Sequence, residues 1–475
     1  MKQRLRVEKS FTEKEVGQVI TQRKQAVKSE MSAGSLIWVG LGGIIGAGFF
    51  LASGLAIKQA GPGVIFAYLL GGLLLAQVAG ALTTLSVDHP VRGSFRVYAE
   101  EFIGPYMGFV VGWAFWISSI LGIGSETVAM AIFTEFWFPG LPLWLISLIY
   151  LALVIGLNAF GVKNFGRIES LMSMVKVGAL FAFICISVLA VFHLLPSTGN
   201  VGFKTLLGNG GLLPMGISGM LRSMLIVIFA YAGISIVAMA ASEVTQPRIT
   251  IPGVTLKVVI ILLVIYTLSM FLITSLTPWQ GISAKESPFV AALAVVGVPW
   301  ASSLMNAIIL VAAFSVMTGA FFAAMTMLIS MGDDGQAPRI LGKPSKNGVF
   351  YPSLIASALG VLLTVVVAYL LPSKVYNYLT SASAYFSFLN WLVILTCYLL
   401  LRKAKRGHEF TSPLSFGRPW TTWLTLAVIL VLFDFSLTVL DQRMGFYSFV
   451  GFVLLINLGY AYYRTKNKGR SGDTN

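Results

Sequence analysis

The run GLGGIIGAGFFLASG, residues 40–54, decides how this chain folds, because it places a helix-breaking pattern inside an apolar segment. Five of its first nine residues are glycine, and each disfavours a helix interior by about 1 kcal/mol relative to alanine. We therefore expect a break in the helix. Inside a membrane such a break is tolerated where it lines a cavity or is buried in protein. Its freed amides attract a carboxylate and its freed carbonyls an ammonium group, although close helix packing through small residues explains the same glycines.

The composition around this run is that of a bilayer protein. Of 475 residues, 57% are hydrophobic and 11% are charged, whereas a soluble globular chain carries roughly 25% charged residues. A spanning helix needs about 20 mostly apolar residues, and backbone polar groups in lipid must be satisfied inside helices or closed barrels. The long uncharged runs therefore predict an all-α integral membrane protein and exclude a soluble multi-domain protein.

The order of apolar runs predicts the organisation of the chain. Twelve spans are expected near residues 33–57, 63–88, 103–135, 142–161, 168–193, 217–246, 253–277, 299–331, 350–371, 374–402, 418–438 and 444–463. The sixth span contains FAYAGIS (229–235), a second candidate break. Interrupted first and sixth spans are typical of two inverted five-helix repeats that meet at a site near the midplane. The predicted parts are a leader (1–32), a first repeat (33–193), a second repeat (217–402), two further helices (418–463) and a tail (464–475).

The basic residues predict the orientation. The net charge is +15, but it is spread over short loops, so it does not indicate a nucleic-acid partner. With both termini inside, 26 of the 33 Lys and Arg residues lie on the cytoplasmic side and five on the other. Because cytoplasmic loops carry the excess of Lys and Arg, we expect a multi-pass protein of the plasma membrane, in a bacterial cell, with both termini cytoplasmic.

Motifs of other function classes are missing where they would matter. The sequence has no phosphate-cradling Gly-x-x-x-x-Gly-Lys-Ser/Thr run, no Gly-x-Ser-x-Gly elbow and no His-Glu-x-x-His pair. Cys185 and Cys397 both fall in apolar segments, which leaves no disulfide framework and no metal-ligand spacing. We therefore expect neither an enzyme nor an ATP-driven pump, and no cofactor or metal.

Four stretches together resemble the amino acid permeases of the amino acid, polyamine and organocation superfamily, over nearly the whole chain. They are GLGGIIGAGFFLASG (40–54), HPVRGSFRVYAEEFIGPYMGFVVGW (89–113), FAYAGISIVAMAASEVTQPRITIP (229–252) and SMGDDGQAPRILGK (330–343). The resemblance implies the leucine-transporter-like fold, with broken first and sixth helices, and coupled uptake of an amino acid through the lipid bilayer.

The resemblance also implies a substrate site. The backbone groups expected to hold the substrate carboxylate and part of its ammonium are those of Ile44, Ile45, Gly46, Ala47 and Gly48. The carbonyls expected to complete the ammonium site are those near Phe229 and Ala230. The residues expected to border the side-chain pocket are Tyr231, Ile234 and Ser235.

Two departures from the family pattern bear on the substrate. Many relatives have a glutamate in span two where this chain has Thr84, and a Thr-Glu pair in span six where it has Ile234 and Ser235. A cationic side chain would lack a buried partner at Ser235. The sequence therefore favours a neutral amino acid.

Two ionisable residues lie inside predicted spans and are candidates for proton coupling. Lys176 is about eight residues into span five, on the order of 12 Å deep at 1.5 Å per residue. In relatives that have a lysine at this position, the lysine takes the place of the sodium ion that sodium-coupled transporters bind. A charge inside the membrane is expensive, which makes Lys176 a functional candidate. A structural ammonium that tethers carbonyls, or a snorkelling side chain, is the alternative. Glu126 is the only carboxylate deep in span three; it either tunes the pocket or relays protons, or forms a structural hydrogen bond.

The resulting hypothesis is a secondary transporter that takes up a neutral amino acid by alternating access, with the proton as coupling ion. The alternatives left open are an amino acid exchanger, a cationic amino acid permease and, from other classes, a channel or a transporter-derived sensor. The sequence does not identify the amino acid, because the pocket depends on how spans three, six, eight and ten pack.

Overall fold

The structure, a computed structural model, is helical throughout the part of the chain it describes. It describes residues 32–89, 91, 93–159, 165–195, 201–208, 210–239, 244, 246–283, 286–297, 299–371, 374–404, 412–414, 416–417 and 419–472. No strand occurs among these residues. The predicted leader up to residue 31 and the last three residues of the predicted tail lie outside the described residues.

Eight helices of the described chain are long and apolar enough to cross a membrane, and four shorter apolar helices of 10–17 residues accompany them. The chain is therefore a multi-pass membrane protein, as its composition predicts. The count of twelve spans and the two inverted repeats stay predictions.

The helices follow the order of the predicted apolar runs. The first half contains α3 (Ala33–Gly42), α4 (Ala47–Phe50), α5 (Ala52–Ala60), α6 (Val64–Asp88), α7 (Phe95–Phe102), α8 (Pro105–Glu135), α9 (Leu143–Ala159) and α10 (Phe165–Val191). The second half contains α11 (Phe203–Gly208), α12 (Gly216–Ala230), α13 (Ser235–Met239), α14 (Pro247–Leu276), α15 (Pro288–Val295), α16 (Pro299–Asp333), α17 (Tyr351–Leu370), α18 (Val375–Ala404), α19 (Trp420–Ser436) and α20 (Leu440–Gly472). Three 3₁₀ turns lie between them, at Gly61–Gly63, Trp279–Gly281 and Arg339–Gly342.

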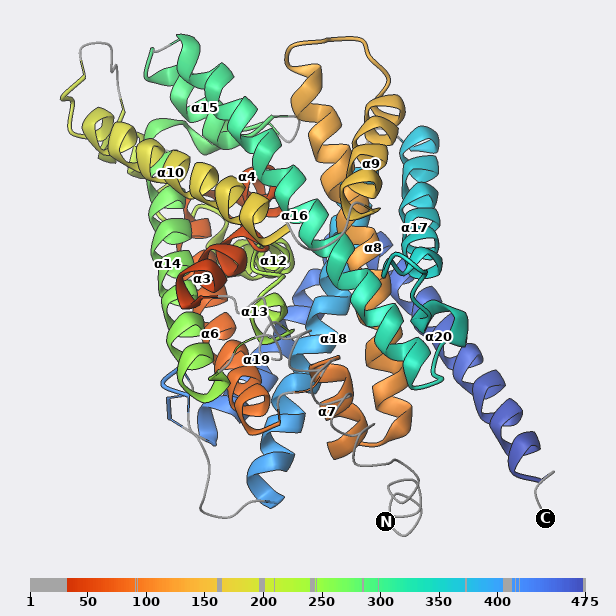
Figure 1. The fold of residues 1–475 in the computed structure, drawn as a ribbon. Helices are drawn as coiled ribbons and strands as arrows, with labels where there is room; N and C mark the ends of the chain where they lie inside the picture. Colours follow the sequence, from red (N-terminus) through yellow and green to blue (C-terminus); the bar gives the residue numbers. More distant parts are fainter. Residues whose placement is uncertain are drawn as a thin grey trace.

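Helical geometry is interrupted at both places where the sequence predicts a break. The backbone is not helical between α3 and α4, nor between α12 and α13. Figure 1 places α3, α12 and α13 at mid-height in the molecule. The two breaks touch each other. Gly233 has a φ of +102°, and a Cβ there would lie 2.5 Å from the carbonyl oxygen of Gly43. Only glycine accommodates both the backbone angle and the close approach.

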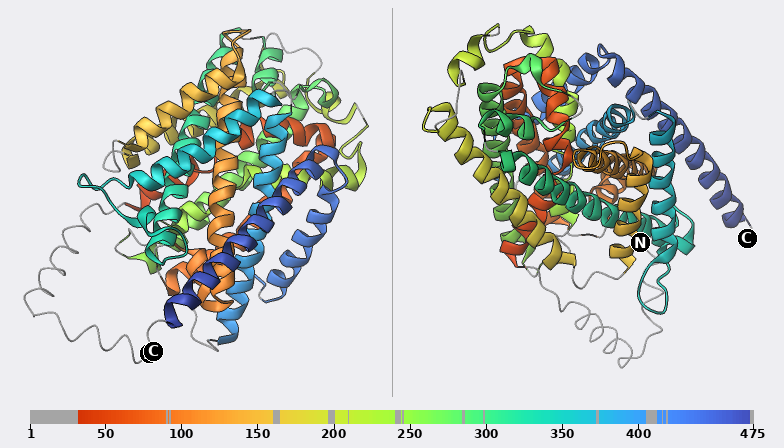
Figure 2. Two further views of the ribbon diagram at one scale, coloured as in Figure 1. Left: turned by 90° about the vertical axis from the view of Figure 1, so that its right-hand side faces the viewer. Right: turned by 90° about the horizontal axis from the view of Figure 1, so that it is seen from above.

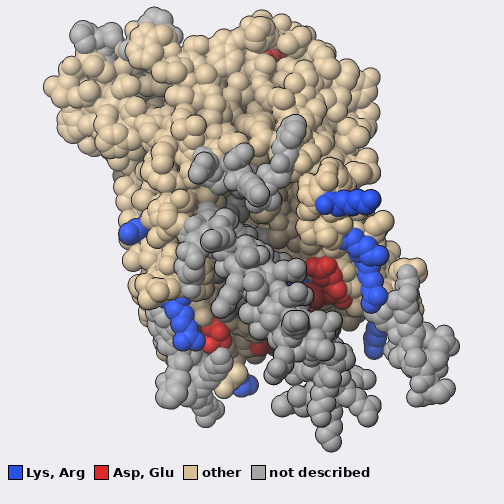
Figure 3. Space-filling view, in the orientation of Figure 1, with Lys and Arg blue, Asp and Glu red and all other residues tan. Residues whose placement is uncertain are grey.

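Long helices surround the two breaks. Helix α8 packs against both α16 and α18, while α10 and α14 pack against α3. Helix α20 runs along the outside of the bundle (Figure 2). Charged side chains gather in the lower part of the face shown in Figure 3, and the upper part of that face is almost entirely uncharged. Figure 1 places α7 and the C-terminal ends of α18 and α20 at this lower end.

Candidate functional site

A cavity of about 130 Å³ lies where the two helix breaks meet α8, α16 and α18. This is well below the roughly 300–1,000 Å³ of pockets for drug-sized ligands. Its polar lining residues are Ser118, Ser119, Glu126, Ser235, Ser383, Ser387 and Asn390. Its larger apolar lining residues are Ile44, Phe95, Phe115, Phe229, Ile234, Val316, Trp391 and Ile394. The cavity therefore offers hydroxyl and amide groups from α8 and α18 in an otherwise apolar wall.

The structure brings about half of the predicted substrate residues to this cavity. Those that line it are Ile44, Gly48, Phe229, Ile234 and Ser235. Those that do not line it are Ile45, Gly46, Ala47, Ala230 and Tyr231. The side chain of Tyr231 is fully buried, and its hydroxyl donates a hydrogen bond to the carbonyl of Tyr68 at 2.9 Å. The predicted roles of all ten residues in substrate binding stay predictions.

Glu126, on α8, is buried and reaches the first break from the side of the cavity. Its Oε2 accepts a hydrogen bond from the amide of Ala47 at 3.0 Å. Amides at the start of a helical segment lack intrahelical partners. A carboxylate of the protein itself therefore satisfies an amide that the helix leaves unpaired.

Lys176, on α10, does not line the cavity but holds the other side of the same break. Its side chain is fully buried, and its Nζ donates to the carbonyl oxygens of Gly42 at 2.5 Å and Ile45 at 3.1 Å. Carbonyls at the end of a helix have no intrahelical donor, and a cation is favoured there. The ammonium therefore stabilises the irregular backbone after α3.

Lys176 also contacts a polar group that the sequence did not reveal as important. Its Nζ donates to Ser315 Oγ on α16 at 2.8 Å, and this hydroxyl donates to Glu169 Oε1 at 2.6 Å. Glu169 lies at the predicted start of span five, where a carboxylate looks like a loop residue. Its separation of seven residues from Lys176 puts both on one helix face, and that spacing was the available signal.

One end of the break region is closed by residues distant in sequence. Tyr376 of α18 donates from its hydroxyl to the carbonyl of Ala47 at 3.1 Å, and Ser287 donates to the carbonyl of Phe50 at 2.7 Å. Phe49 stacks on Tyr266 with ring centroids 3.6 Å apart. Phe49 and Phe50 have no exposed surface. The cavity consequently extends towards α7, which supplies Phe95 to its wall.

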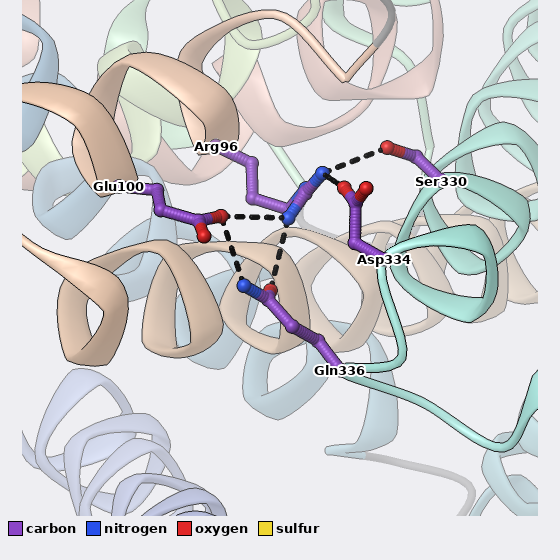
Figure 4. Close-up of polar contacts among 5 residues, drawn as sticks. All are labelled: Arg96, Glu100, Ser330, Asp334 and Gln336. Carbon is purple, nitrogen blue, oxygen red and sulfur yellow. Dashed lines mark hydrogen bonds and ion pairs between the residues drawn. The ribbon is translucent and has the colours of Figure 1, made fainter. Parts of the chain in front are cut away.

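A second polar cluster joins α7 to the end of α16 (Figure 4). The fully buried Arg96 of α7 donates to Gln336 at 2.9 Å and Ser330 at 3.0 Å, and forms an ion pair with Asp334. Glu100 accepts from both Arg96, at 3.3 Å, and Gln336, at 2.9 Å. Since α7 borders the cavity and α16 carries Ser315, the cluster fixes two elements of the site to each other.

Comparison with known proteins identifies relatives over most of the chain. The family model for amino acid permeases matches residues 35–472. A gamma-aminobutyric acid permease of Bacillus subtilis (strain 168) is 34% identical over 412 residues, which cover 86% of this chain and 88% of that protein. A gamma-aminobutyric acid permease of Escherichia coli (strain K12) is 34% identical over 82% of this chain and 84% of its own. A putative histidine permease of Bacillus subtilis (strain 168) is 32% identical over 94% and 96%.

Proposed function

The chain belongs to the amino acid permease family, and from this premise we propose that it carries a small neutral amino acid into the cell by proton-coupled alternating access. The observation that carries the proposal is the meeting of two helix breaks at a buried, partly polar cavity. Broken helices at mid-membrane that face one cavity are the arrangement that transporters use to bind charged small molecules with backbone groups.

The lining of the cavity supports a neutral substrate. Of the described residues in its wall, Glu126 is the only ionisable one, and it is already bonded to a backbone amide. Asn390 Oδ1 is buried and has no hydrogen-bond partner among the described residues, so a donor on the substrate can use it. The family resemblance puts Ser235 where many relatives have a glutamate. A substrate side chain here meets hydroxyls, one amide and aromatic rings.

The proposed binding mode uses the backbone for the groups that all amino acids share. The amides after the first break bind the carboxylate, and the carbonyls of both breaks bind the ammonium. One of these amides, that of Ala47, is held by Glu126, so substrate binding and the charge of Glu126 are linked. A proton on Glu126 weakens its hold on this amide, because a neutral acceptor forms weaker hydrogen bonds than an ionised one. The amide is then free for the substrate.

The proposed orientation follows from the distribution of basic residues. Both termini, and the end of the molecule that carries α7, lie in the cytoplasm. In this orientation the contacts of Tyr376 and Ser287 close the outer side of the site, and the cavity extends inwards to α7. The conformation is then one in which substrate exchanges with the inner side.

The proposal is tested by uptake of a panel of radiolabelled amino acids into proteoliposomes that contain no amino acid, with and without an inward proton gradient. Accumulation of one or a few neutral amino acids that collapses with a protonophore supports it. Uptake only after preloading with amino acid makes the protein an exchanger. Uptake of lysine or arginine in place of neutral amino acids rejects the proposed substrate class.

A further inference from the structure

Glu169, near the start of α10, is a buried carboxylate whose hydrogen bonding is incomplete. Its exposed fraction is 1%. One oxygen, Oε1, accepts from Ser315, while Oε2 has no hydrogen-bond partner among the residues that the structure describes. A buried carboxylate oxygen without a partner is costly, and an ionisable group inside a membrane protein is by default a functional candidate.

Ser315 joins this carboxylate to the buried ammonium of Lys176. The same hydroxyl accepts from Lys176 Nζ at 2.8 Å and donates to Glu169 Oε1 at 2.6 Å. A hydroxyl can accept one proton and give up another, whereas the other two acceptors of Lys176, the carbonyls of Gly42 and Ile45, offer no proton to pass on. The three side chains thus form one continuous chain of hydrogen bonds between two titratable groups.

We propose that Ser315 and Glu169 form the route by which a proton leaves Lys176 during transport; this inference rests on the proposed proton coupling. The ammonium of Lys176 gives a proton to Ser315 Oγ, and the hydroxyl proton of Ser315 passes to Glu169 Oε1. The products are a neutral amine, an unchanged serine and a carboxylic acid. Rotation of the hydroxyl restores the starting arrangement. Rotation of the carboxylic acid group then brings the protonated oxygen to the unpartnered position of Oε2, where Glu169 releases the proton when water reaches it.

The transfer removes two charges from a buried site. Both Lys176 and Glu169 are buried, and separating two ions from water is expensive unless they neutralise each other or pair well. Among the described residues, Glu169 and, on α8, Glu126 are the charged groups that act on Lys176, and Lys176 is the charged group that acts on Glu169. Proton transfer to Glu169 leaves both members of the α10 pair neutral.

The relay is placed where proton loss changes the shape of the break. A Cβ on Gly42 would collide with Glu169 Oε1 and Ser173 Oγ, so the carboxylate lies directly against the last residue of α3. A neutral amine at Lys176 has fewer protons to donate and forms weaker bonds to the carbonyls of Gly42 and Ile45. Proton departure therefore loosens the first break from α10, and this links the proton to the movement of the helix that holds the substrate.

The test compares Glu169→Gln and Ser315→Ala with matched controls in proteoliposomes. The controls are Glu135→Gln, at the exposed end of α8, and Ser187→Ala, a buried serine on α10. Three quantities are measured: proton-driven accumulation of the transported amino acid, its dependence on pH, and proton entry reported by a trapped pH dye. Substrate affinity is measured separately by equilibrium binding in detergent.

We expect both relay variants to lower proton-driven accumulation on the order of 100-fold, as for loss of a positioned proton-transfer group, and to flatten its pH dependence. Affinity should change little, because neither residue lines the cavity. Ser315→Thr keeps the hydroxyl and should restore much of the activity. The two controls should behave like the unmodified protein.

Three outcomes overturn the relay. One is full accumulation with an unchanged pH profile in Glu169→Gln. Another is that both relay variants lose substrate binding and also lose the monodisperse peak in size-exclusion chromatography. That result would show that the two residues have a structural role. The third is a failure of Ser315→Thr to recover more than Ser315→Ala. If the unmodified protein carries no protons, both the proposed proton coupling and the relay are wrong. If proton coupling stays intact in all variants, the relay is wrong and the proposed coupling stands.

Discussion

The carboxylate of Glu126 accepts a hydrogen bond at 3.0 Å from the amide of Ala47, across the break that follows α3. Ala47 is also one of the residues that the family resemblance assigns to the substrate carboxylate. Two carboxylates cannot both use one amide donor. Under the proposed binding mode, the occupant of this amide is decided by the ionisation of Glu126 and by the presence of substrate, and this competition gives the first prediction.

Glu126→Gln should raise the apparent affinity for the amino acid and abolish its dependence on pH. The amide side chain keeps the shape but is a weaker acceptor than a carboxylate, so it releases the amide of Ala47 more easily. Equilibrium binding measured between pH 5 and 8 checks this, with Glu135→Gln as the control. An affinity that falls, or that still follows pH as before, contradicts the competition.

Lys176→Ala should abolish concentrative uptake driven by a proton gradient. The substitution removes the donor to the carbonyls of Gly42 and Ile45 and leaves them unsatisfied, at about 1–3 kcal/mol for each buried group. Uptake with and without a protonophore is the measurement, and melting in detergent reports the loss of stability. Proton-independent concentrative uptake by this variant would rule out a coupling role for Lys176.

Gly233→Ala should destabilise the protein by about 1–3 kcal/mol, the usual range for a residue held in a sparsely populated backbone region, and abolish transport. Its Cβ would lie 2.5 Å from the carbonyl oxygen of Gly43, so the breaks must move apart. Thermal melting in detergent together with uptake checks this. Gly253→Ala is the control, because Gly253 lies within α14 with open space where its Cβ would be. Equal behaviour of the two variants would show that the contact between the breaks is dispensable.

Arg96→Ala should lower stability by about 1–3 kcal/mol, because its removal leaves the side chain of Gln336 and its charged neighbours without their buried donor. It should also loosen α7 from the end of α16, and so change the entry and exit of substrate on that side. Melting and the rate of substrate counterflow are the measurements. Arg339→Ala, at an exposed arginine beyond α16, is the matched control. An unchanged melting temperature and counterflow rate in Arg96→Ala would contradict this role.

Ser235→Glu should shift the preference from neutral towards cationic amino acids. Ser235 lines the cavity, and a carboxylate there supplies the buried partner that a cationic side chain needs. The ratio of lysine to neutral amino acid uptake is the measurement, and Ser235→Gln is the uncharged control. A ratio that rises equally in both variants would attribute the change to pocket shape and not to charge.

The amino-acid sequence was enough to predict an all-helical membrane protein and the order of its apolar helices. Local composition decides whether a segment enters a bilayer, because the penalty for a charge or an unpaired peptide group in lipid acts segment by segment. The glycines of residues 40–48 likewise predicted the first break, since the preference of glycine against a helix interior is a local property. The structure bears out the helical class and the first break, which lies between α3 and α4 inside that run.

The side chains that meet at the breaks could be identified from the packing of the helices but not from the sequence. Glu169 looked like a residue at the end of a span, yet Ser315, 146 residues later in the chain, places it in contact with the Lys176 network. Tyr231 belonged to an expected pocket, yet its hydroxyl is engaged by Tyr68 on another helix. Such pairings depend on the rotation and packing of whole helices. Apolar spans carry little periodic signal to fix that rotation, because lipid and protein neighbours are about equally apolar.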